Sequence, residues 1–165
     1  MNGKGVSILV GCLGMAALLL VGRMDGQTSP SKHEEHKIIQ SDSTVYRPGP
    51  AALPPGAQFA VLEGDPDKEG NVTMRIKVPA NYRIPPHTHP KLERVTVLEG
   101  TLKIGMGRVY EETAMTELGS GGFFVMPPGM EHFAGSETGG VIQLNVVGPW
   151  RIDYLNPEDD PRRKP

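Results

Sequence analysis

Cysteine is nearly absent from this chain, and the single cysteine, Cys12, lies in a short apolar segment at the start. If that segment is removed, the remaining protein has no thiol, so disulfides and thiol chemistry are both excluded. A surplus of positive charge is also lacking, because the formal net charge is −2. Nucleic-acid recognition calls for a basic patch or stripe. We therefore expect no nucleic-acid partner.

Long helical periods and internal repeats are missing as well. From Gln58 onward, short apolar runs are separated by turn signals rich in Gly, Pro, Asn and Asp. Apolar residues alternate with polar or small ones in three of these runs, at residues 74–78, 102–106 and 142–146. Alternation of this kind is typical of strands with one buried face. The pattern predicts an all-β sandwich or barrel in one domain.

The first 26 residues have the features of a secretory signal. Lys4 precedes an uncharged apolar run at residues 6–21, and the small residues Gly22 and Gly26 follow. The run is short for a membrane span, which needs about 20 apolar residues; a retained anchor is the alternative. We expect an exported protein, periplasmic or secreted, with membrane contact only if the segment is retained.

The remaining chain divides by composition into a linker, a domain and a tail. Residues 27–44 are polar and predict a linker, residues 45–156 a β-barrel domain, and residues 157–165 a flexible C-terminal tail. His33 and His36, with two acids between them, could bind a metal. A solvated tether is the preferred interpretation of such a polar stretch.

One short stretch carries the strongest chemical signal. His87 and His89 are one residue apart, so their side chains point to the same face of a strand. Glu93 follows four residues after His89. His132 lies three residues after the end of a Pro-Pro-Gly turn signal. Imidazole and carboxylate together suit a divalent transition metal. We predict a mononuclear site with four ligands: His87, His89, Glu93 and His132.

The spacing of these residues resembles that of the cupin superfamily. The first cupin motif is met by His87, His89, Glu93 and Gly100, and the second by Gly121, Pro127, Gly129 and His132. Two positions depart: Asn81 replaces the usual first Gly, and Ser136 replaces the usual final Asn. Neither position is a ligand in the family, so the departures concern local backbone geometry. The resemblance implies a conical double-stranded β-helix with the metal inside, and a homodimer.

Metal identity stays open among Mn, Fe, Ni, Cu, Co and Zn, since all accept imidazole and carboxylate. Two open positions on an octahedral ion would suit an oxygenase, isomerase or lyase acting on a small molecule. The alternatives are a non-catalytic module that binds a sugar or phenolic ligand, and a purely structural metal. We favour the enzyme, with its catalytic acid and base unknown. Five residues belong either to the barrel mouth or to the core: Tyr82, Met106, Phe124, Phe133 and Trp150.

Overall fold

The computed structural model describes residues 36–163, and the expected secretory segment at residues 1–26 lies outside this part, as does His33. Residues 38–163 belong to one compact unit. Within residues 36–163, no helix is long and apolar enough to cross a membrane. The proposed domain boundaries at residues 45 and 156 stay predictions.

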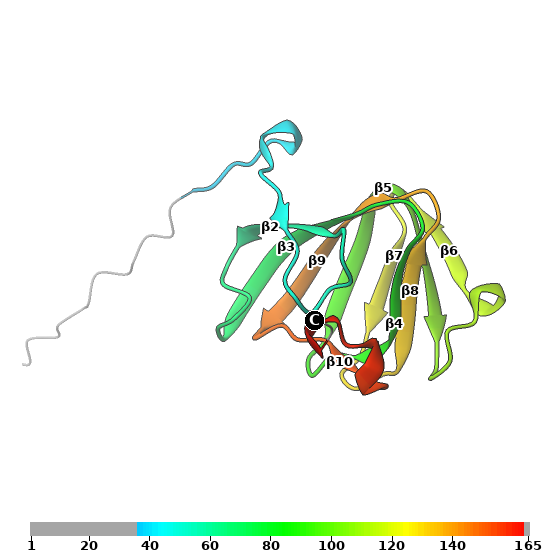
Figure 1. Ribbon diagram of the computed structural model, residues 1–165. Helices are drawn as coiled ribbons and strands as arrows, with labels where there is room; N and C mark the ends of the chain where they lie inside the picture. The colour runs from blue at the N-terminus through cyan, green and yellow to red at the C-terminus, as the bar shows by residue number, and fades with distance from the viewer. Residues whose placement is uncertain (1–35, 164–165) are drawn as a thin grey trace, which may run out of the picture. The chain divides into compact units, whose positions relative to one another are not determined.

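Antiparallel strands joined by short turns make up almost all of the regular structure (Figure 1). The helical segments of the described residues are 3₁₀ turns: η1 (Ser41–Ser43), η2 (Glu112–Ala114), η3 (Pro157–Asp159) and η4 (Pro161–Arg163). The strands are β1 (Arg47–Pro48), β2 (Gln58–Glu63), β3 (Gly70–Val78), β4 (Tyr82–Thr88), β5 (Glu93–Met106), β6 (Thr116–Gly119), β7 (Phe123–Met126), β8 (His132–Ser136), β9 (Gly140–Gly148) and β10 (Asp153–Tyr154). The all-β prediction is confirmed.

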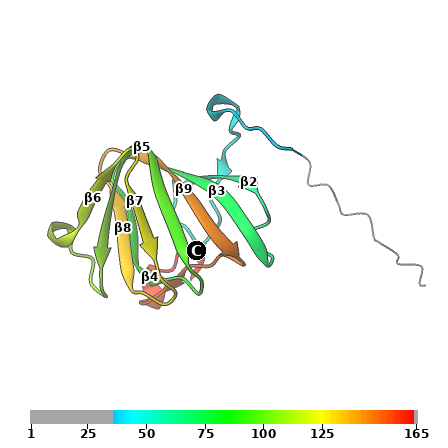
Figure 2. The ribbon, with the colours of Figure 1, turned by 180° about the vertical axis from the view of Figure 1, so that it is seen from behind.

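The strands form two sheets that share β5 and curl around a common interior (Figure 2). One sheet has the order β1-β2-β3-β9-β5-β7, and the other has the order β10-β4-β8-β5-β6. Residues 93–96 of β5 lie between β9 and β7, whereas residues 103–104 lie between β8 and β6. The long strand β5 therefore carries the chain from one sheet to the other.

Gly100 marks the point where β5 changes sheets. Its φ is +68°, in the left-handed region that glycine adopts without steric cost. A Cβ here would lie 2.2 Å from the carbonyl oxygen of Gly139, which is less than any real contact. The pairing of β5 with β9 also shifts register between Val97 and Glu99. A glycine is therefore required both by the backbone conformation and by the neighbouring turn.

The core fills the space between the two sheets with side chains from alternate positions. In β3, Met74 and Ile76 are buried while Lys77 is exposed, which confirms the alternation expected there. Met106 is the exception to the pattern at residues 102–106: it is the last residue of β5 and is 54% exposed. The core also contains Val72, Val78, Tyr82, Ile84, Val95, Val97, Leu102, Ile142, Leu144, Val146 and Ile152.

The two departures from the cupin motifs have local explanations. Asn81 has a φ of 59°, and Asn is one of the few non-glycine residues that tolerate this conformation. The buried hydroxyl of Ser136 donates a hydrogen bond to the carbonyl oxygen of Thr101 at 2.6 Å, which ties β8 to β5. Asn81 thus adopts a backbone conformation that glycine favours, and Ser136 links two strands.

The C-terminal segment lies against the barrel end that carries β10 (Figure 1). A guanidinium nitrogen of Arg162 donates to the carbonyl oxygen of Ile152 at 3.0 Å, and Arg162 also pairs with Asp160. Residues 157–163 of the segment expected to be a tail thus form η3 and η4. The flexibility of that segment stays a prediction.

Candidate metal centre

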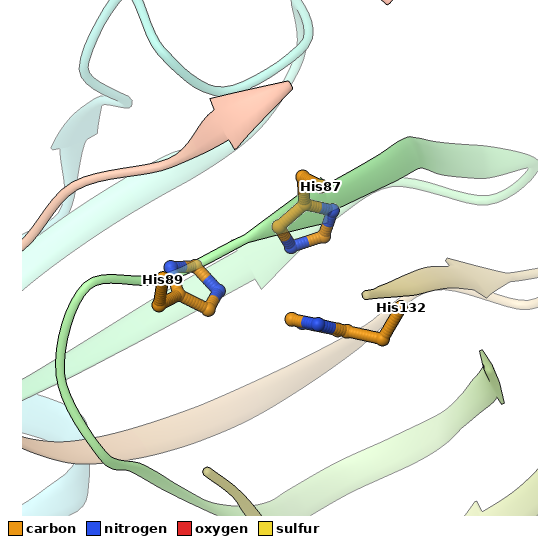
Figure 3. A group of neighbouring side chains, drawn as sticks. All are labelled: His87, His89 and His132. Carbon is orange, nitrogen blue, oxygen red and sulfur yellow. The ribbon is translucent and has the colours of Figure 1, made fainter. Parts of the chain in front are cut away.

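Three histidines from two neighbouring strands meet inside the barrel (Figure 3). His87 lies near the end of β4, His89 directly follows that strand, and His132 begins β8. The pairing of β4 with β8 places His87 opposite His132. One ring nitrogen from each histidine lies within 4.8 Å of the other two, and all three residues are at least 96% buried. The structure therefore brings together three of the four predicted ligands.

Two prolines shape the strand that carries His87. Proline has no N–H to donate to a sheet, so Pro85 and Pro86 cannot continue the hydrogen-bonded ladder. The pairing with β8 shifts register between Ile84 and His87, which is a β-bulge. The carbonyl oxygen of Pro85 meets Nδ1 of His87 at 2.7 Å. The bulge thus places a backbone acceptor where it can orient the ring of His87.

Each of the three rings is held in the same way, through Nδ1 and a backbone carbonyl. Nδ1 of His89 is 2.7 Å from the carbonyl oxygen of Arg151, and Nδ1 of His132 is 2.9 Å from that of Met130. A carbonyl oxygen only accepts, so Nδ1 must carry the hydrogen in each ring. In the neutral imidazole, Nε2 then keeps its lone pair. Three Nε2 atoms are therefore left available as metal ligands.

Burial keeps two of these rings neutral. Burial, the charge of His132 and the charge of His89, in that order, hold the pKa of His87 well below its usual value. Burial also lowers the pKa of His132, although its hydrogen bond to Met130 acts in the opposite direction. Only neutral imidazole binds a metal ion. The environment therefore favours the protonation state that metal binding requires.

Glu93 lies beside the histidines, at the start of β5. It is 5% exposed, and its Oε2 is 3.4 Å from Nε2 of His89. Its other oxygen, Oε1, accepts a hydrogen bond from Nε1 of Trp150 at 3.0 Å. Within the described residues, the group of ligand atoms that all lie within 4.8 Å of one another contains the three histidines and does not include Glu93. Metal binding by Glu93 stays a prediction.

The chemistry of this donor set fits a cation. Nε2 of His89 and Oε2 of Glu93 both carry lone pairs, and they face each other at 3.4 Å. Two acceptors at that distance repel each other unless a positive charge, either a bound cation or a proton on His89, lies between them. Imidazole nitrogen and carboxylate oxygen are ligands that divalent transition metals accept. The residues present are therefore able to hold the metal ion that the cupin resemblance implies.

The histidines open onto a small, largely apolar cavity inside the barrel. About 40 Å³ of it is open to the centre of a water-sized molecule. Tyr82, Phe124 and Trp150 line the cavity, whereas Phe133 lies outside it, where it contacts the ring of Tyr110. The hydroxyl of Tyr82 is already engaged in a structural contact, because it donates a hydrogen bond to the carbonyl oxygen of Pro54 at 2.7 Å. Aliphatic residues make up most of the remaining wall: Leu53, Ile76, Val78, Ile84, Val95, Leu102, Ile104, Ile142, Leu144 and Ile152.

Sequence reasoning missed the groups that surround the histidines. Trp150 was expected at the mouth or in the core, but it also donates a hydrogen bond to Glu93, 57 residues earlier. The carbonyl oxygens of Arg151 and Met130 have no signature in the sequence, because every residue carries one. The sequence offered one signal for these groups: Trp150 is the single tryptophan and lies close to the end of the predicted barrel domain.

Solved structures with a similar fold include several cupins. The polyketide cyclase RemF from Streptomyces resistomycificus is 22% identical, with a TM-score of 0.59 over 78% of this chain and 91% of its own. A protein from Methylibium petroleiphilum PM1, proposed to be an acetylacetone dioxygenase, is 18% identical, with a TM-score of 0.58 over 77% and 85%. An RmlC-like cupin from Shewanella frigidimarina is 18% identical, with a TM-score of 0.53 over 68% and 91%. These likenesses confirm the cupin barrel.

No curated protein matches the chain. The sequence profile of the ChrR cupin-like domain matches residues 34–149, which is well over half of the chain. The matched region includes both cupin motifs and all four predicted ligands, and the three histidines form a group that could bind a metal ion. The chain therefore belongs to the family of ChrR cupin-like domains.

Proposed function

We propose that this protein is a metalloenzyme that holds one divalent transition-metal ion with His87, His89 and His132, joined by Glu93. The observation that carries the proposal is the set of three buried Nε2 atoms, each left with its lone pair by a hydrogen bond from Nδ1 to a carbonyl oxygen. A bound ion would supply Lewis-acid or oxygen chemistry at the cavity.

The protein's own groups would orient the ligands and exclude water. Hydrogen bonds from Nδ1 to backbone carbonyls fix the ring orientation, a feature that typically strengthens metal binding. Glu93 is the only carboxylate among the residues that line the cavity, so it is the one side chain there that can offset part of the charge of the ion. The aliphatic wall keeps the local dielectric constant low, which strengthens every charge interaction at the site.

The cavity limits the class of substrate. No Lys or Arg side chain is among its lining residues, so an anionic group would have only the bound ion to pair with, and Glu93 already offsets part of that charge. Its open volume of about 40 Å³ is also far below the roughly 150 Å³ that accommodates a benzene molecule. We therefore propose a small, uncharged, oxygenated substrate. The names of two structural relatives, a polyketide cyclase and a proposed acetylacetone dioxygenase, refer to ketones.

Metal analysis of the full-length chain tests the proposal first. Protein purified without added metal should contain close to one equivalent of a transition metal, and His87→Ala and His132→Ala should each lose it. The loaded protein should then turn over a small aliphatic ketone from a panel, monitored by substrate loss and oxygen uptake. Metal content that does not change in the two variants would contradict the proposal.

A non-catalytic binding module is the second candidate. It is favoured by the scarcity of proton-transfer groups at the cavity, where Glu93 is the only acid apart from the phenol of Tyr82. A small uncharged ligand would then bind saturably and be recovered chemically unchanged, and binding of a sugar or a phenol would show that the cavity can widen. Calorimetric titration followed by mass analysis of the recovered ligand separates binding from turnover.

Export and self-association complete the proposal. The apolar segment at residues 6–21 supports export, and the cupin resemblance supports a homodimer. Fractionation of cells that express the tagged chain would test the first, with the cytoplasmic fraction as the contradicting location. Light-scattering mass measurement would test the second.

A further inference from the structure

Trp150 contacts two of the predicted ligands at once. Its indole N–H donates to Oε1 of Glu93 at 3.0 Å, and its ring lies nearly parallel to that of His89, with centroids 6.0 Å apart and an interplanar angle of 22°. The ring of Phe59 is also nearly parallel to it, with a centroid distance of 6.5 Å. The backbone N–H of Trp150 donates to the carbonyl oxygen of Pro66 at 2.7 Å, so the residue is held at both ends.

We propose that Trp150 is a positioning residue of the metal centre: its indole N–H retains Oε1 of Glu93, so that the carboxylate presents Oε2 to the ion. The inference rests on the proposed metal site. Oε2 is the oxygen that lies 3.4 Å from Nε2 of His89, on the side of the histidines. The structure thus assigns different tasks to the two oxygens of one carboxylate.

The environment of Glu93 makes this hydrogen bond strong. The carboxylate is buried, and no Lys or Arg lines the cavity beside it. A hydrogen bond from a neutral donor to an ionised acceptor is stronger than one between neutral groups, and a low dielectric constant strengthens it further. In the described part of the chain, the indole is the one side-chain N–H that donates to Glu93. Loss of that N–H would leave Oε1 free to turn toward the ion or toward water.

Metal affinity in a double-mutant cycle tests the proposal on the full-length chain. Zn²⁺ affinity would be measured by competition with a chromophoric chelator for the unchanged protein, Trp150→Phe, Glu93→Gln and the double variant. Phenylalanine keeps a smaller aromatic ring and removes the N–H, so the Glu93→Gln background is needed to separate the loss of the hydrogen bond from the loss of ring volume. Trp150→Phe should weaken Zn²⁺ binding by about 10- to 100-fold, the usual effect of losing such a partner. In the Glu93→Gln background, the same substitution should change affinity by less than about threefold, because no carboxylate remains to be positioned.

A control variant separates positioning from packing. Phe59→Leu removes an aromatic neighbour of Trp150 but leaves the hydrogen bond to Glu93 in place, so its Zn²⁺ affinity should stay within about threefold of the original. Equal losses from Trp150→Phe in both backgrounds would show a purely structural role and overturn the proposal. Unchanged affinity in Trp150→Phe would overturn it as well.

A spectroscopic measurement covers the case in which Trp150→Phe does not fold. Trp150 is the only tryptophan of the chain, so the ultraviolet resonance Raman band that follows indole N–H hydrogen bonding reports on this residue alone. Glu93→Gln should shift that band toward a weaker hydrogen bond in the metal-free protein, and an unshifted band would refute the proposal. If His132→Ala abolishes Zn²⁺ binding while Trp150→Phe does not weaken it, the metal site stands and the role of Trp150 falls. If His87→Ala and His132→Ala both leave binding intact, the metal site itself is wrong.

Discussion

Enlarging Gly105 by one carbon tests the contact that holds Phe133 next to the metal centre. Gly105 lies opposite Phe133 in the pairing of β5 with β8, and the next pair along the ladder includes His132. A Cβ on Gly105 would lie 2.2 Å from Cε2 and 2.3 Å from Cζ of the Phe133 ring. Carbon atoms in ordinary contact are about 3.5–4.0 Å apart. The ring must therefore move by more than about 1 Å to admit the methyl group.

The ring of Phe133 has little freedom to move. It is completely buried, and the ring of Tyr110 lies 5.0 Å from it, centroid to centroid. Overpacking of this kind typically costs about 1–3 kcal/mol. Replacing glycine by alanine inside a strand recovers roughly 0.5–1 kcal/mol of backbone entropy. We therefore expect Gly105→Ala to lower the free energy of unfolding by about 1–2 kcal/mol.

Urea unfolding, followed by the fluorescence of the single tryptophan, measures this change through the midpoint at constant slope. Gly119→Ala is the matched control, because Gly119 also lies in a strand and its Cβ would meet nothing within 4 Å. This control should be neutral or slightly stabilising. Phe133→Leu in the Gly105→Ala background should cost less than Phe133→Leu alone, since the smaller side chain relieves the clash. The reasoning is refuted if Gly105→Ala and Gly119→Ala are equally stable.

Three further predictions concern the site and the point at which β5 changes sheets. In metal-free protein, the free energy of unfolding should fall as the pH drops below about 6.5, because histidines of the unfolded chain bind protons there while buried His87 and His132 do not. Urea midpoints between pH 5 and 8 measure this change. A flat profile would argue against neutral buried rings. Zn²⁺ at 100 times its dissociation constant should raise the free energy of unfolding by about 2.7 kcal/mol. Calorimetry should show this rise in the original chain and not in His132→Ala, and a similar rise in both would place the ion elsewhere. Gly100→Ala should destabilise by more than about 1 kcal/mol because its Cβ would meet the carbonyl oxygen of Gly139, and a normal melting temperature would exclude the clash.

Much of the fold follows from local patterns in the sequence. Apolar and polar residues alternate because successive side chains of a strand point to opposite faces, and this predicted the buried face of β3 and β9. The same rule placed His87 and His89 on one side of their strand. The glycine of the first motif was predictable because no other residue adopts the backbone of Gly100 so easily.

Phe133 shows where the local pattern stops being informative. Alternation places the side chain of Phe133 on the opposite face of β8 from those of His132 and Ala134. The pattern does not say which of the two faces other parts of the chain will cover. In the structure, Tyr110 packs over it from a loop, and the small Gly105 admits its ring. Both faces of β8 are therefore buried, and Phe133 belongs to the buried core rather than to the barrel mouth.

By itself, the sequence determined the strand period, the glycine turns and the set of candidate ligands, because each depends on residues close together in the chain. The tertiary structure alone decided how those ligands are held. The partner of Glu93 lies 57 residues away, and that of the His89 ring lies 62 residues away. Contacts across such distances depend on how the two sheets close around β5, which no local pattern encodes. The same closure decided that the cavity is small and free of cationic side chains.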